Sequence, residues 1–262
     1  MELIYGVLFT VGIAAGFVAG LFGIGGGVIL VPLFWFFFQK IGVPQELSFK
    51  LAVATSLSVI AVSTLFSTVS HILKGSYPLK EAAKLLIFSL PGVLAGVLLA
   101  HYLPVKALKN IFGIFLVITG VKLLLSGRGS RKLRVKERVI VPLTVVLSGF
   151  LSSLLGIGGG VVVNSILFSV EGIKVERTVA IASAASFLNA LLGAALYLMV
   201  PAEKVLCCQV GLVYVPGAVL VACGSLIGVK LGLRVLRGLN QHHLKKLFAV
   251  MLLVIAAKIL LL

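Results

Sequence analysis

Ten blocks of apolar residues follow one another along the 262-residue chain, separated by short polar loops. The blocks run approximately over 3–22, 28–38, 51–70, 85–103, 108–126, 139–155, 161–170, 178–200, 205–229 and 244–262. Most of them approach the roughly 20 residues that a helix needs to cross a bilayer. Charged residues make up 11% of the chain, against about 25% in a typical soluble domain. The sequence therefore predicts an all-α polytopic membrane protein and excludes a soluble fold.

The chain also contains an internal repeat. Residues 16–27 read GFVAGLFGIGGG and residues 149–160 read GFLSSLLGIGGG, and the two segments align without a gap. A repeat of this kind indicates two related halves. We therefore predict three parts, namely a first transmembrane repeat, a basic linker and a second transmembrane repeat: 1–126, 127–138 and 139–262.

Two of the apolar blocks, 28–38 and 161–170, are too short to cross a membrane, and each directly follows a GIGGG segment. In one topology each short block completes a broken crossing helix, which gives eight crossings and two halves of the same orientation. In the other, each GIGGG segment turns the chain back as a re-entrant hairpin. Each half then has three further transmembrane helices, and the halves are inverted.

The distribution of charge favours the inverted topology. It places most of the 23 Lys and Arg residues on the membrane face that carries the linker, as the positive-inside rule requires. We accordingly predict a multi-pass plasma membrane protein with a cytoplasmic linker and both termini outside. The chain turns apolar directly after Glu2, without a transit peptide, which favours a prokaryotic plasma membrane.

Each GIGGG segment would open a short helix at membrane depth. The first amides of a helix have no intrahelical partner and carry the positive end of its dipole. Glycine lets a ligand approach these amides closely, so two such helix ends that face each other would bind an anion. The alternative is that the glycines only allow close helix packing. The glycines of this predicted site are Gly23, Gly25, Gly26, Gly27, Gly156, Gly158, Gly159 and Gly160.

Hydroxyl and amide side chains near the glycines are candidates to complete the site. Thr55 and Ser56 begin the helix after the first short block, and Ser183 is their counterpart in the second half. Asn164 and Asn189 are further candidates, because an unpaired amide in hydrocarbon is costly. We predict that these five side chains provide directional hydrogen bonds to the substrate.

Other classes of function find no support in the residues. The chain has no aspartate, and its seven glutamates fall in loops or at helix ends, so no buried carboxylate relay is visible. No catalytic motif, metal-ligand cluster or cofactor fingerprint is present, which predicts a protein that is not an enzyme and has neither cofactor nor metal. The net charge of +16 lies in short loops between apolar blocks, which argues against nucleic acid as a partner.

The glycine segments, the Thr55–Ser56 pair and the later Pro91–Gly92 pair resemble the TauE/SafE sulfite-exporter family over essentially the whole chain. The resemblance implies a membrane permease for sulfite, for sulfonates such as sulfoacetate, or for related small anions. It also implies a substrate role for the glycines and for Thr55 and Ser56. The second half departs from the family pattern, since Ser165 replaces the proline and Ser183–Ala184 replaces the Thr-Ser pair.

We therefore predict a permease that exports a small sulfur-containing anion by alternating access. The expected partners are this small anionic substrate and the lipid bilayer. Because no embedded carboxylate is visible, we predict export that is driven by the membrane potential alone. Two alternatives remain, namely an anion channel and a membrane scaffold subunit that transports nothing.

Overall fold

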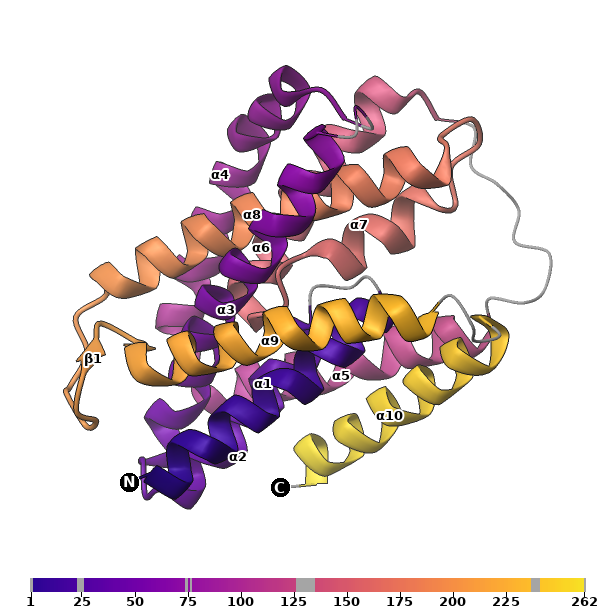
Figure 1. Cartoon of the computed structure of the whole chain (residues 1–262). Helices are drawn as coiled ribbons and strands as arrows, with labels where there is room; N and C mark the ends of the chain where they lie inside the picture. Colours follow the sequence, from indigo (N-terminus) through magenta and orange to yellow (C-terminus); the bar gives the residue numbers. More distant parts are fainter. Residues whose placement is uncertain are drawn as a thin grey trace.

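A computed structural model describes residues 2–22, 26–73, 75, 77–125, 135–236 and 241–261. The described part of the chain is almost entirely helical (Figure 1). The helices before the linker are α1 (Glu2–Phe22), α2 (Gly27–Lys40), α3 (Gln45–Leu73), α4 (Leu79–Tyr102) and α5 (Val105–Leu125). Those after it are α6 (Glu137–Leu155), α7 (Gly160–Leu167), α8 (Val175–Met199), α9 (Val215–Leu236) and α10 (Gln241–Leu261).

Four helices in the described part of the chain have the length and composition of membrane spans. Helices α3, α4, α6 and residues Glu176–Met199 of α8 are each long and apolar enough to cross a bilayer. Large apolar side chains also point outward from the bundle. Examples are Ile87, Leu143 and Val254, which are 70%, 65% and 63% exposed. Such side chains are stable facing lipid and costly facing water. The protein is therefore an all-α polytopic membrane protein, as predicted.

The two halves are interlocked. Helix α1 packs along α9, and α6, its counterpart in the repeat, packs along α4, the counterpart of α9. Helices α3 and α8, which correspond to each other, pack together, and so do α5 and α10. Each of these four contacts joins one helix of the first half to one of the second. The inversion of the halves relative to the membrane stays a prediction.

Glycines let the interlocked helices approach closely. A Cβ atom added at Gly16 in α1 would overlap the carbonyl oxygen of Ser225 in α9. A Cβ atom at Gly92 in α4 would likewise overlap the carbonyl of Val146 in α6. Close backbone approach of this kind is the usual way in which helices associate in a bilayer.

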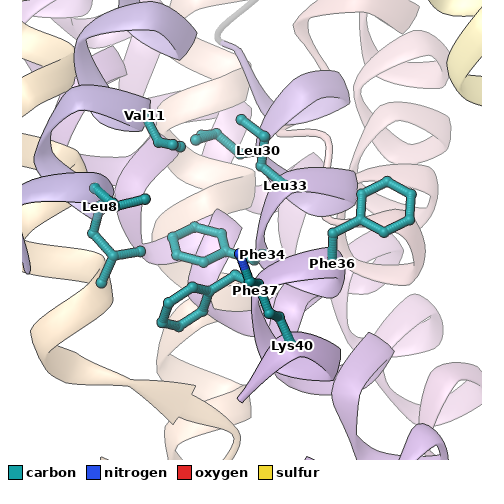
Figure 2. Close-up of a pocket in the computed structure, with 9 residues that line it drawn as sticks. Leu8, Val11, Leu30, Leu33, Phe34, Phe36, Phe37 and Lys40 are labelled. Carbon is teal, nitrogen blue, oxygen red and sulfur yellow. The ribbon is translucent and has the colours of Figure 1, made fainter. Parts of the chain in front are cut away.

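Each short helix runs antiparallel to the helix that precedes it. An apolar cavity of about 180 Å³ lies between α1 and α2, lined by Val7 and Leu8 near the start of α1 and by Phe37 and Lys40 near the end of α2 (Figure 2). The start of α1 thus lies beside the end of α2. In the second half, Val141 near the start of α6 shares a core cluster with Leu167 at the end of α7. Both pairs are therefore helical hairpins.

One predicted block is not a continuous helix. Residues 205–229 begin with a small antiparallel hairpin of β1 (Gln209–Val210) and β2 (Val213–Tyr214), and α9 starts only at Val215. The turn contains Gly211 with φ of +53°. The buried side chain of Gln209 accepts hydrogen bonds from the amides of Val205 and Leu206, both at 3.2 Å. These bonds satisfy a loop backbone that a helix would have satisfied internally.

Candidate anion site at the glycine segments

The helices α2 and α7 both begin after a glycine in the left-handed conformation. Gly26 caps α2 with φ of 73°, and Gly159 caps α7 with φ of 84°. The two glycines occupy matching positions of the repeat. Only glycine adopts this conformation without a steric penalty. The third amide of each helix, of Ile29 and Val162, bonds to the carbonyl of the capping glycine, so the first two amides of each helix point away from it as donors.

The two glycine segments meet directly. The hydroxyl of Ser56 in α3 donates a hydrogen bond of 2.9 Å to the carbonyl of Gly156, which caps the end of α6. A Cβ atom on Gly27 would lie 2.7 Å from Cα of Ile157 and 2.8 Å from the carbonyl oxygen of Gly156. The start of α2 therefore lies against the turn that precedes α7, and the described part of the first segment abuts the second.

Polar side chains of α6 and α8 surround the start of α7. The amide of Asn189 donates to the hydroxyl of Ser148 at 3.0 Å. A Cβ atom on Gly159 would lie 2.8 Å from Nδ2 of Asn189, and one on Gly160 would lie 2.5 Å from the hydroxyl oxygen of Ser186. Asn189 is fully buried, and its Oδ1 atom has no hydrogen-bond partner among the described residues. A buried polar atom without a partner costs stability and calls for a ligand, a water or a functional reason.

Three of the predicted side chains lie outside these contacts. Thr55 is fully buried, and its hydroxyl oxygen accepts a 3.1 Å hydrogen bond from the amide of Tyr214 at the end of β2. The hydroxyls of Ser183 and Ser67 lie 3.0 Å apart and join α8 to α3. Asn164 is partly buried on α7, one turn after its start, with Oδ1 unpaired. The structure thus brings Ser56 and Asn189 to the described glycines. Thr55 and Ser183 contact other residues, and Oδ1 of Asn164 is unpaired among the described residues.

The remaining predicted glycines divide into two groups. Gly158, with φ of 76°, lies within the turn between α6 and α7, and residues 156–160 are all buried. Gly23 and Gly25 lie outside the described residues. The turn of the second half is therefore the part of the site for which the geometry is complete.

Two side chains near the site were not among the predicted residues. Ser148 receives the bond from Asn189, and Ser186, rather than Ser183, lies against Gly160. Ser186 lies three residues from both Ser183 and Asn189, so helical spacing places it near the face of Asn189. Ser148 directly precedes the glycine that opens the repeated segment, and only its hydrogen-bond partner in another helix marks it as part of the site.

Two lysines hold the short helices from the opposite half. Lys122 in α5 donates a 2.9 Å hydrogen bond to the carbonyl of Ser165 in α7. Lys258 in α10 lies 4.2 Å from the ring centre of Phe36 in α2. Lys122 and Lys258 occupy corresponding positions near the ends of α5 and α10. Each glycine-capped helix is thus anchored by a cation from the other repeat, which adds positive charge near both short helices.

Comparison with known proteins agrees with this architecture. A family model described as sulfite exporter TauE/SafE matches residues 8–259. A probable membrane transporter protein of Methanocaldococcus jannaschii is 31% identical over 246 residues, which cover 93% of this chain and 90% of that protein. A probable membrane transporter protein of Haemophilus influenzae is 29% identical over 254 residues, 94% of each chain. No solved structure matches the chain.

Proposed function

Because this chain belongs to the TauE/SafE sulfite exporter family and is a membrane transporter, we propose that it carries a small sulfur-containing anion such as sulfite or a sulfonate. The observation that carries the proposal is the meeting of the two glycine segments, where Ser56 bonds to Gly156 and Gly27 lies against Ile157. The amides that begin α2 and α7 would bind the oxygens of the anionic head. The family and its relatives indicate a transporter rather than an enzyme.

Side chains of both halves would orient the bound anion through hydrogen bonds. The hydroxyl of Ser56 and the amide of Asn189 lie at the two glycine segments and can donate hydrogen bonds to an oxyanion. Asn189 carries a second buried polar atom, Oδ1, that an ion or an ordered water would satisfy. The site has different side chains on its two sides, which fits a small anion with one charged end and one organic or asymmetric end.

Burial supports transport by alternating access. Residues 156–160 are buried between helices of both halves, so an anion reaches them only when those helices move. Rocking of one half against the other would expose the site to each side in turn. An inside-negative potential of about 100 mV drives a monovalent anion outward with about 2.3 kcal/mol. We propose export that uses this potential without a coupled cation.

Transport in liposomes tests the proposal. We expect saturable flux of sulfite or a sulfonate that follows an imposed potential and persists without proton or sodium gradients. A flux that requires one of these gradients would contradict uncoupled export, and a flux that never saturates would indicate a channel. The same anion should stabilise the purified protein, by about 2.7 kcal/mol at 100 times its dissociation constant.

A matched pair of glycine variants tests the location of the site. Gly27→Ala places a methyl group against the backbone of Ile157 and Gly156 and should abolish the stabilisation by the anion. Gly6→Ala is the control, because a Cβ atom at Gly6 in α1 meets no atom within 4 Å. Trp35 is the only tryptophan and lies in α2, so its fluorescence reports that each variant is folded. Anion binding that survives in Gly27→Ala would exclude the glycine site.

A further inference from the structure

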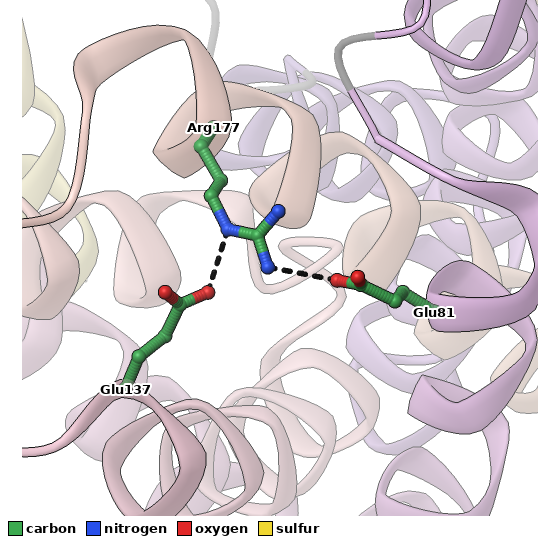
Figure 3. Close-up of polar contacts among 3 residues, drawn as sticks. All are labelled: Glu81, Glu137 and Arg177. Atoms are coloured by element: carbon green, nitrogen blue, oxygen red, sulfur yellow. Dashed lines mark hydrogen bonds and ion pairs between the residues drawn. The ribbon is translucent and has the colours of Figure 1, made fainter.

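An ion triad joins the first turns of three helices at one end of the bundle. Arg177 in α8 donates from Nε to Glu137 in α6 at 2.7 Å and from Nη2 to Glu81 in α4 at 2.8 Å (Figure 3). Its guanidinium carbon lies 5.5 Å from the ring centre of Tyr77. The three charged side chains are between 34% and 40% exposed. The triad thus bridges the two halves and remains within reach of an ion from outside.

Farther along the same three helices, toward the interior of the bundle, lie buried polar groups without hydrogen-bond partners among the described residues. Each of these side chains is at most 2% exposed, and each has an oxygen that is unpaired: Ser89 in α4, Thr144 and Ser152 in α6, and Thr178 and Asn189 in α8. Unpaired buried polar groups are rare in proteins and call for an explanation, such as a bound water or ion or a functional role. Of the seven unpaired buried side-chain atoms in the described residues, five belong to this set.

These groups span the distance from the triad to the glycine segment. At a rise of 1.5 Å per residue, Thr144 lies about 10 Å and Ser152 about 22 Å beyond Glu137 along α6. Asn189 lies about 18 Å beyond Arg177 along α8, next to Gly159. Ser89 lies about 12 Å beyond Glu81 along α4. The three helices therefore present polar groups at successive depths, from the triad to the start of α7.

The surface around the triad attracts anions. Five exposed cations lie in the first two turns of α4 and α6 or in the segments that precede α6 and α8: Lys80, Lys84, Lys136, Arg138 and Lys174. They outnumber the exposed Glu171 and Glu176 near the start of α8, and an excess of charge of one sign raises the local concentration of the opposite ion. Arg177 differs from these residues because its planar guanidinium can bind two oxygens of an oxyanion at once. In the structure those donor positions are occupied by Glu81 and Glu137.

We propose that Arg177 is an anion-binding subsite that precedes the glycine site, at which the transported anion displaces Glu81 and Glu137 from the guanidinium. Release of the two carboxylates separates the first turns of α4, α6 and α8. The anion then passes the unpaired hydroxyls of Thr178, Thr144 and Ser89 and reaches Asn189 and Gly159. The transported anion is that of the proposed function, on which this inference rests.

Kinetics of three triad variants test the role of Arg177. The double variant Glu81→Gln, Glu137→Gln removes the competing carboxylates, so KM for the anion on this face should fall about tenfold, since one hydrogen bond to a charged group corresponds to a factor of ten or more. Arg177→Gln should raise KM by a similar factor. Arg177→Lys keeps the charge but loses the planar guanidinium, so its KM should lie between those of the unmodified protein and Arg177→Gln. An unchanged KM in both Arg177→Gln and the double variant would overturn the subsite. Lys84→Gln is the control for loss of one nearby charge.

A thiol placed below the triad tests the route independently of transport. The variant Thr144→Cys is made with Cys207→Ser, Cys208→Ser and Cys223→Ser, so that it carries one thiol. A membrane-impermeant thiol reagent should modify this thiol at least tenfold faster when Glu81→Gln and Glu137→Gln are added, because the carboxylates that close the triad are gone. An equal rate would overturn the route.

The two measurements separate this inference from the proposed function. Modification that accelerates in a protein that transports no sulfur anion would overturn the proposed function and support an opening at the triad. Transport that is normal while the Thr144→Cys thiol stays protected in every variant would leave the proposed function intact and overturn the route. Fluorescence of Trp35 confirms in each case that the variant is folded.

Discussion

The hydroxyl of Ser56 and the carbonyl of Gly156 lie 2.9 Å apart, although 100 residues separate them in the chain. Ser56 belongs to α3 of the first half, and Gly156 ends α6 of the second. The last carbonyls of a helix have no partner within it, and the bond from Ser56 satisfies one of them in a buried position. One side chain therefore fastens the first half to the glycine turn of the second.

Loss of this hydrogen bond should be costly. Ser56→Ala leaves the carbonyl of Gly156 buried and unpaired, so we expect the free energy of unfolding to fall by about 1–3 kcal/mol. Ser58→Ala is the matched control, because the Ser58 hydroxyl bonds only to the carbonyl of Ala54 in its own helix. Denaturant unfolding in detergent measures both. Equal effects of the two substitutions would contradict a special role of Ser56.

Much of the architecture could be predicted from the pattern of apolar residues. The short helices begin at Gly27 and Gly160, one residue before the predicted blocks 28–38 and 161–170, because each apolar run starts directly after its glycine segment. The hairpin at 209–214 was missed, since an apolar run is compatible with either a buried strand or a helix.

The partners within the site were harder to predict. Helix α8 contacts α3, α4, α6 and α7, so it is apolar on several sides and its sequence does not single out one face. The alignment of the two halves predicts Ser183 as the counterpart of the Thr-Ser pair, whereas Ser186 lies against Gly160. The pairing of Asn189 with Ser148 depends on how α6 and α8 cross, which a linear sequence does not specify. The substrate roles of all these residues stay predictions.

The two lysines that contact the short helices should contribute similar amounts of stability. Lys258→Met removes the cation from the ring of Phe36, and Lys122→Met removes the hydrogen bond to Ser165. We expect each substitution to lower the free energy of unfolding by about 0.5–1 kcal/mol. The exposed Lys106 is the control, and Lys106→Met should have a smaller effect. If all three variants unfold alike, the lysines do not anchor α2 and α7.

The cysteines test the predicted orientation in the membrane. Cys207 and Cys208 are exposed in the loop before β1, which the inverted topology places outside. A membrane-impermeant maleimide should therefore label them in intact cells. It should not label Ser130→Cys in the linker when Cys207→Ser, Cys208→Ser and Cys223→Ser are also present, unless the cells are opened. The reverse pattern would place the linker outside.

The rate at which the maleimide labels Cys208 should rise with pH. The sulfur atoms of Cys207 and Cys208 lie 3.4 Å apart, and the hydrogen bond between the two thiols and the charge of Cys207 raise the pKa of the Cys208 thiol. The thiolate is the reactive form, so Cys208 should react more slowly than an ordinary exposed thiol at neutral pH, and faster as the pH rises. Cys207→Ala should remove the difference. Labelling of Cys208 that is independent of pH would contradict the interaction.

Asn189 gives the sharpest electrostatic test of the anion site. Asn189→Asp keeps the shape of the side chain but replaces the donor next to Gly159 with a negative charge. Repulsion should abolish the stabilisation by the transported anion at neutral pH, as measured by thermal unfolding with and without the anion. Asn110→Asp, at an exposed position of α5, adds the same charge away from the site and should leave anion binding unchanged. If Asn189→Asp binds the anion as the unmodified protein does, the anion is not held at the start of α7, and the amides of α2 alone would have to hold it.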